Sequence, residues 1–149
     1  MTTFSGFCEL RTPKDLLRKL EHDFGRISDN PEDEFAAFDF FVTAEHIVDW
    51  LYPSNRTDRE NMRLNNPLVA ITSHIANGAK HFVATYKHHK SVAGVERSKY
   101  FAEDCVEKGY VAEPILVKLS PAEAAVLGAS EIEAPELALK VLNFWKSRL

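Results

Sequence analysis

Hydrophobic positions recur at helical spacing over most of the chain, and one segment is apolar on nearly every side. Asn30 can cap that helix, Pro31 suits its first turn, and Pro53 ends it after about Tyr52. A helix that is apolar around most of its surface is usually central to its domain. We therefore expect the core helix over residues 31–52. Its broad apolar face comprises Ala36, Ala37, Phe40, Phe41, Ala44, Ile47, Val48 and Leu51.

The same capping and spacing signals predict further helices. They cover residues 12–25, ending at Gly25; residues 66–88, with Pro67 in the first turn; residues 120–128, closed by Gly128; and residues 135–149. Gly78 lies inside the second of these, and we expect tight packing against a neighbour to offset its helical cost. The polar segment 54–66 is expected to be a loop with a short helical turn.

One strand is predicted over Ile115–Leu119, where apolar positions alternate. Pro114 places it at a sheet edge or at its own beginning. A lone strand needs a partner, which we expect near Val92–Val95 or from a second subunit. The sum is a mostly α fold, a bundle of four to five helices with a small β strand or hairpin appendage near residues 110–119. No repeat or linker divides residues 1–149, so we expect one domain.

The composition of the chain argues against several classes of protein. The chain has 149 residues, 45% of them hydrophobic, which is enough to bury a core, so disorder is excluded as the main state. No long apolar run or basic leader predicts a membrane span or a secretory signal. Cys8 and Cys105 carry no disulfide pattern. We therefore expect a cytoplasmic protein that does not enter a membrane.

Charge is segregated along the chain. Seven acids and no Lys or Arg lie between Arg26 and Arg56, whereas residues 61–95 contain no acid and four histidines. The core helix is therefore acidic and the helix after it is basic. One interpretation is electrostatic matching within the bundle, and exposed pairs of this kind contribute only about 0–1 kcal/mol each. The other is a site between the two helices.

Asn77, Lys80 and His81 form a cluster suited to a phosphate. Lysine supplies charge, asparagine supplies directed hydrogen bonds, and histidine exchanges a proton near neutral pH. In a metal-free ribonuclease, His81 would be the base and Lys80 the cation, with Glu45 or Asp49 orienting the imidazole. The alternative is that His81 is an ordinary surface histidine.

The histidine spacing argues against a metal site. His74 and His81 are seven positions apart, which is about 10.5 Å along a helix and too far for one zinc ion. A metal held by one of them together with Glu45 or Asp49 is the remaining possibility. We expect no metal and no cofactor.

A basic patch with interleaved aromatics follows the cluster and fits a surface that tracks RNA. A basic helix end also complements the helix dipole, which is the simpler explanation. The substrate-binding residues expected in this region are His74, Lys87, His88 and Lys90.

Three segments, FDFFVTAEHIVDWLYP, HIANGAKHF and LALKVLNFWKS, resemble a family of small uncharacterised bacterial proteins of about this length. More distantly, a helical bundle with an Asn-x-x-Lys-His element resembles the HEPN group of nucleotide-binding and ribonuclease domains. That resemblance implies RNA or a nucleotide as the ligand. HEPN ribonucleases carry an arginine a few residues before the histidine, and here Asn77 stands before His81 instead. The departure removes the cation expected at the scissile phosphate and leaves the bundle analogy.

Two hypotheses follow from the sequence. In the first, the protein binds or cleaves RNA or a nucleotide phosphate in a groove between the core helix and the basic helix. In the second, it is a non-enzymatic interaction or regulatory module, for example a homodimer, that uses the mixed aromatic and acidic face of the core helix. The interface anchors would then be Phe35, Phe38, Val42 and Trp50.

Overall fold

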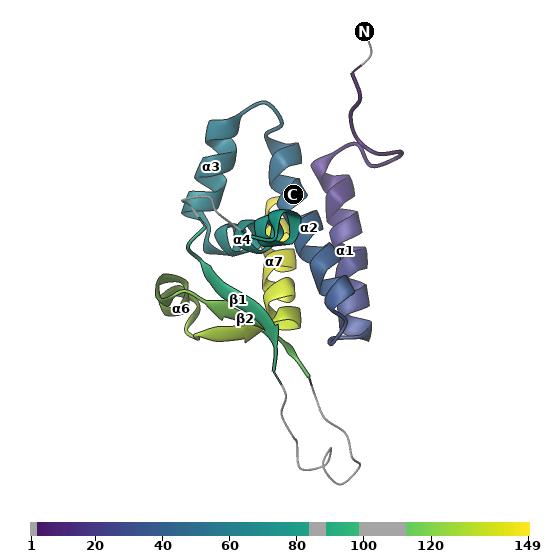
Figure 1. Ribbon diagram of the computed structural model, residues 1–149. Coiled ribbons are helices and arrows are strands. Elements are labelled where there is room, and N and C mark those ends of the chain that lie inside the picture. The colour runs from purple at the N-terminus through teal and green to yellow at the C-terminus, as the bar shows by residue number, and fades with distance from the viewer. Residues whose placement is uncertain (1–2, 84–88, 99–112) are drawn as a thin grey trace.

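The computed structural model of the protein describes residues 3–83, 89–98 and 113–149. Within them the chain forms six helices and one three-stranded antiparallel sheet (Figure 1). The helices are α1 (Pro13–Asp29), α2 (Glu34–Leu51), α3 (Arg56–Asn65), α4 (Pro67–His81), α6 (Pro121–Leu127) and α7 (Ala134–Arg148). The strands are β1 (Val92–Arg97), β2 (Ile115–Leu119) and β3 (Glu131–Glu133), and they lie in the order β1-β2-β3. The expected mostly α fold with a small β appendage is confirmed.

Helix α2 lies at the centre of the bundle, as its all-round apolar sequence predicted. It packs along α1 and against α4 and α7. The sheet contacts α7 through β2 and β3, and α7 begins directly after β3 (Figure 1). The α2 side chains Phe40 and Ile47 are fully buried among residues from the other layers. Those neighbours in the core include Leu20 of α1, Ile71 of α4, Val117 of β2 and Trp145 of α7.

Helix α1 begins where the sequence predicted and ends later. Thr12 accepts a hydrogen bond from the Asp15 amide at 3.2 Å, and the Asp15 carboxylate accepts one from the Thr12 amide at 2.9 Å. This capping box fixes the start. Gly25 does not end the helix, because the backbone stays helical there and the Asn30 amide donates to the Arg26 carbonyl at 3.1 Å instead.

The start of α2 was predicted three residues too early. Asp33, not Asn30, is its N-cap, and the Asp33 carboxylate accepts hydrogen bonds from the amides of Phe35 and Ala36. Asn30 serves as the C-cap of α1. Asp33 stands directly before Glu34, the first residue of α2, and takes the N-cap position there.

The expected loop at residues 54–66 is wrong, because most of it is helix α3. The Asn55 side chain accepts a hydrogen bond from the Asp58 amide at 3.0 Å and caps the helix, and Arg56 pairs with Glu60 one turn later. No residue of α3 is buried. The hydrophobic periodicity that reveals other helices is therefore missing here.

Helix α4 ends at His81 rather than near His88. Phe82 has a φ of 66°, which is outside the helical region, and it is 94% exposed. Residues 84–88 lie outside the described part of the chain. None of the described helices is long and apolar enough to cross a membrane.

The strand at Ile115–Leu119 is the central strand of the sheet. It begins directly after Pro114, and its partner is β1 of the same chain, with Val95 opposite Val117. The expected partner segment is thus confirmed within one subunit. The sequence analysis did not predict β3, which adds Ile132 opposite Val117 on the other side.

A charged groove between α2, α3 and α4

A groove of about 830 Å³ lies between α2, α3 and α4 and is bordered by the segment before β1. We call it the charged groove. Its polar lining comprises Glu45, His46 and Asp49 of α2; Arg56, Arg59, Glu60 and Arg63 of α3; Ser73, Asn77, Lys80 and His81 of α4; and His89, Lys90, Ser91 and Glu123. The three predicted cluster residues and both predicted carboxylates therefore share one groove.

Glu45 is the buried acid of this groove, with 7% of its surface exposed. The Nε of Arg63 donates to its Oε1 at 2.9 Å, and the Arg63 Nη2 contacts the same oxygen and lies 3.2 Å from Asp49 Oδ1. Oε2 has no hydrogen-bond partner among the described residues. Burial raises the pKa of Glu45 to about 7, although the Arg63 charge opposes the shift. Glu45 can therefore gain or lose a proton near neutral pH.

A short polar chain continues from Glu45 across the groove. The Ser73 Oγ lies 3.3 Å from Glu45 Oε1 and also 3.3 Å from the Nε2 of His89. Ser73 has one hydroxyl proton, so when it donates to Glu45 the contact with His89 requires His89 to donate. A proton on Nε2 of His89 is thus coupled to the charge on Glu45.

The acids of α2 are matched by arginines and not by the basic face of α4. Asp39 pairs with Arg26 of α1 at 2.6 Å, and Glu45 pairs with Arg63 of α3. Electrostatic matching within the bundle is therefore present, but its cations come from α1 and α3 and not from α4. Because α3 supplies the counter-charges, the lysines of the groove are left for other partners.

Lys80 and Lys90 are the cations of the groove that make no ion pair with any described residue. Both side chains are exposed. Asn77 stands one turn before Lys80 and donates to the Ser73 carbonyl at 3.2 Å, which orients its amide. The groove thus contains two lysines without ion pairs to described residues, beside the hydrogen-bonded side chains of Glu45, Arg63 and Ser73.

His81 lines the same groove but is not joined to either predicted carboxylate. The hydrogen bonds of Glu45 go to Arg63 and Ser73, and Asp49 meets Arg63 and, at 3.9 Å, Arg59. His81 is exposed at the end of α4. An imidazole held by Glu45 or Asp49 is not present in this arrangement.

His74 is placed elsewhere, and two of the other expected binding residues cannot be assessed. The Nδ1 of His74 accepts the amides of Ser91 and Val92 at 3.2 and 3.0 Å, and burial lowers its pKa. Its ring stacks on His89 with 5.2 Å between centroids. His74 therefore anchors the start of β1. Lys87 and His88 lie outside the described residues.

The sequence analysis missed the arginines of the groove. Arg56, Arg59 and Arg63 have the spacing of one helical face, but they fall in the segment that was expected to be a loop. Treating residues 56–65 as a helix would have found them. Ser73 and His89 gave no local signal, because their meeting depends on how α4 returns to the sheet.

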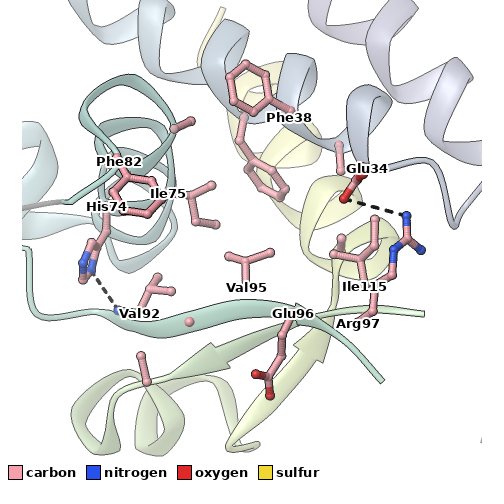
Figure 2. Close-up of a pocket in the computed structure, with 17 residues that line it drawn as sticks. Glu34, Phe38, His74, Ile75, Phe82, Val92, Val95, Glu96, Arg97 and Ile115 are labelled. Carbon is pink, nitrogen blue, oxygen red and sulfur yellow. Dashed lines mark hydrogen bonds and ion pairs between the residues drawn. The ribbon is translucent and has the colours of Figure 1, made fainter. Parts of the chain in front are cut away.

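A second groove lies on the opposite face of α4, with a volume of about 480 Å³ (Figure 2). We call it the apolar groove. Its walls are Ala37, Phe38 and Phe41 of α2; Ile75, Gly78 and Ala79 of α4; Phe82, directly after α4; and all six residues of β1. Phe38 lines both grooves. Helix α4 thus separates a charged surface from an apolar one.

Among the described residues, no group of three or more His, Cys, Asp or Glu side chains could hold a metal ion. The comparisons with protein-family models, with curated proteins and with solved structures find no match for this chain.

Proposed function

We propose that the charged groove binds the phosphate of an RNA or of a nucleotide. The observation that carries the proposal is the charge arrangement: α3 neutralises Glu45 and Asp49 of α2, while Lys80 and Lys90 keep no ion-pair partner among the described residues. Such lysines and a nearby side-chain amide donate hydrogen bonds, and the charged oxygens of a phosphate are well suited to accept them. Asn77 and His81 add a directed donor and a titratable group on the same wall.

Cleavage of RNA is the stronger form of the same proposal. His81 would take the proton of a ribose 2′-hydroxyl, and the 2′-oxygen would attack the adjacent phosphorus. The bond from phosphorus to the 5′-oxygen then breaks, and water protonates the leaving oxygen. Lys80 would stabilise the negative charge of the phosphorane. This step rests on no metal ion.

The experiment is incubation of the full chain with end-labelled single-stranded RNA, with and without EDTA. The variants are Lys80→Ala and His81→Ala, and Lys140→Ala is the matched control because Lys140 is an exposed lysine of α7 outside both grooves. We expect Lys80→Ala to weaken RNA binding at least tenfold and the control to leave it unchanged. Cleavage that resists EDTA and is lost in His81→Ala supports the stronger form.

Two outcomes would contradict the proposal. If wild-type protein neither shifts nor cleaves RNA and binds no nucleoside triphosphate, the groove has another ligand. If both groove variants unfold, the cluster is structural. Because Lys80 and His81 are exposed, we expect their melting temperatures to stay within a few degrees of the wild-type value.

A second candidate function is an interaction module on α2. Phe35 and Phe38 are 72% and 50% exposed, which supports this reading. Trp50 does not belong to such a surface, since it packs against the core. A change of the solution mass on Phe35→Asp, measured by light scattering, would support a homodimer through these residues, and a monomer in both proteins would exclude it.

A further inference from the structure

The outer edge of β1 is open toward the apolar groove. Within the described residues, β1 has a neighbouring strand, β2, on one side only, because the sheet has the order β1-β2-β3. All six of its residues line the groove. Figure 2 shows Val92 and Val95 pointing from β1 toward the helices, whereas Glu96 points away.

The register identifies which backbone groups face that edge. The Ser98 amide donates to the Pro114 carbonyl at 3.0 Å, so Arg97 and Ile115 form a pair that exchanges no hydrogen bonds of its own. Bonded and non-bonded pairs alternate along an antiparallel ladder. The backbone amides and carbonyls of Val95 and Arg97 therefore point away from β2. No described residue forms a hydrogen bond with these outward groups.

A second observation supports this direction at the other end of β1. The Ser120 amide donates to the Ser91 carbonyl at 3.0 Å, which makes the Val92–Leu119 pair non-bonded as well. The Val92 amide is indeed turned outward, where His74 of α4 accepts it at 3.0 Å. Thus His74 of α4 already accepts from the first outward amide of β1, that of Val92. The outward groups farther along β1 line the apolar groove.

Two glycines keep the groove wide. Gly78 of α4 and Gly94 of β1 both line it, neither has a positive φ, and a Cβ added to either would meet nothing within 4 Å. The expectation that Gly78 allows close helix packing is therefore wrong. A glycine inside a strand often marks the close approach of another backbone or a bulge. A bulge lies at Val92–Gly94, but it leaves Gly78 unexplained.

We propose that the apolar groove binds an extended segment of a partner protein, which adds a fourth strand to the edge of β1. The partner's backbone would pair with the outward groups of Val95 and Arg97. Its alternate side chains would pack against Phe38, Ile75 and Phe82. β1 spans five residue steps, about 16 Å, so a segment of five to six residues fills the groove.

Charge at the two ends selects the chemistry of the segment. At one end, Glu34 is 66% exposed at its side chain and lies 4.0 Å from Arg97, whose guanidinium also donates to the Glu32 carbonyl at 2.7 Å. The Arg97 guanidinium donates its hydrogen bonds to the backbone carbonyls of Glu32 and Glu113, so the exposed Glu34 carboxylate keeps only this 4.0 Å ion pair among the described residues. At the other end, His74 accepts two amides on Nδ1 and is therefore uncharged. The segment carries aliphatic side chains at alternate positions and a Lys or Arg at the end beside Glu34.

The test begins with a random heptapeptide library displayed on phage and selected on the full chain. We expect enrichment of alternating aliphatic sequences with a basic residue at one end. An enriched peptide is then synthesised with a single N-methyl group at each position in turn, and its affinity is measured by fluorescence anisotropy. Strand addition predicts at least a tenfold loss at every second position and little change between them. No enrichment, or an equal response at all positions, would overturn the proposal.

Two variants locate the binding on β1 and α4. Gly78→Leu fills the groove, and Gly25→Leu is the matched control, because Gly25 is a helical glycine of α1 with equally open space and lies outside both grooves. Val95→Pro removes an outward amide and spares the ladder with β2. We expect both groove variants to lose at least tenfold in peptide affinity, and RNA binding in the charged groove to stay unchanged. Equal affinity in Gly78→Leu and Gly25→Leu would exclude the groove.

A second copy of the chain is the alternative occupant of the apolar groove. The same variants distinguish this homodimer from binding of a partner segment. If the wild-type protein is a dimer by light scattering and Gly78→Leu is a monomer, the groove is a homodimer interface and the proposed partner segment is wrong. If the wild-type protein is a monomer, the peptide measurements decide alone. The failure of RNA binding has no bearing on either result, since Lys80 and His81 lie on the other side of α4.

Discussion

Arg63 donates from its Nε to Oε1 of Glu45 at 2.9 Å, and this contact ties a helix without buried residues to the central helix of the fold. Within α3, only the partly buried Met62 packs against the hydrophobic core. The arginines of α3 therefore replace hydrophobic packing with a hydrogen-bonded pair around a nearly buried carboxylate.

Arg63→Ala should destabilise the protein by about 2–3 kcal/mol. The substitution leaves Glu45 buried without its counter-charge, and removing one partner of a buried pair costs more than the pair contributes. Urea unfolding at pH 7 measures the change. Arg56→Ala is the control, because Arg56 pairs with Glu60 at the surface of the same helix, and it should cost less than about 0.5 kcal/mol. Equal losses in the two variants would contradict the structural role of Glu45.

The stability of the protein should fall as the pH rises from about 4.5 to about 7 because of Glu45. Its pKa is 4.5 in the unfolded chain and about 7 in the fold, so the folded state holds the proton more tightly across this window. The favourable contribution is complete below pH 4.5 and is lost as the pH passes 7, a change of about 3 kcal/mol. The difference in unfolding free energy between the wild-type protein and Glu45→Gln, followed from pH 4 to pH 8, isolates this effect. A constant difference would show that Glu45 titrates normally.

Gly78→Ala should stabilise the protein by about 0.5–1 kcal/mol. The position is helical, a Cβ there meets nothing within 4 Å, and alanine reduces the freedom of the unfolded chain. Gly128→Ala should do the opposite by about 1 kcal/mol, because Gly128 ends α6 with a φ of 79°. Thermal melts of the two variants should shift in opposite directions. A loss of stability in Gly78→Ala would mean that the groove is narrower than described.

Thr43→Val should destabilise the protein by about 1–3 kcal/mol. The Thr43 hydroxyl donates at 2.7 Å to the buried carboxylate of Asp23, which also holds Lys19 at 2.7 Å. A buried charge that loses a donor is expensive. Thr72→Val is the matched control, since the buried Thr72 hydroxyl bonds only to the Leu68 carbonyl of its own helix at 2.8 Å. Chemical denaturation should show the larger loss for Thr43→Val.

Several local predictions from the sequence are confirmed for identifiable reasons. The capping box of Thr12, the apolar face around Phe40 and the left-handed Gly128 all depend on residues within one or two turns. The end of α1 was wrong because a glycine permits a helix to end but does not require it. Helix α3 was missed because its stability does not come from an apolar stripe.

The candidate site was predicted in part. Asn77, Lys80 and His81 lie one turn or less apart on α4, so their clustering follows from helical spacing alone. That Glu45 and Asp49 border the same groove was inferred from the charge pattern of two neighbouring helices. Glu45 was expected to orient the imidazole of His81 on α4, but it bonds to Arg63 of α3 instead, because a charge pattern does not specify which of several neighbours approaches closest.

Caps and the helical period act over a few residues, so sequence patterns alone locate the central helix, its buried face and the residues of α4 that line one groove. The tertiary structure decided that Arg63 reaches Glu45, that His74 holds the start of β1, and that one edge of β1 remains open. These contacts join residues 17 or more positions apart. Such pairings depend on the relative placement of packed elements, which local spacing does not encode.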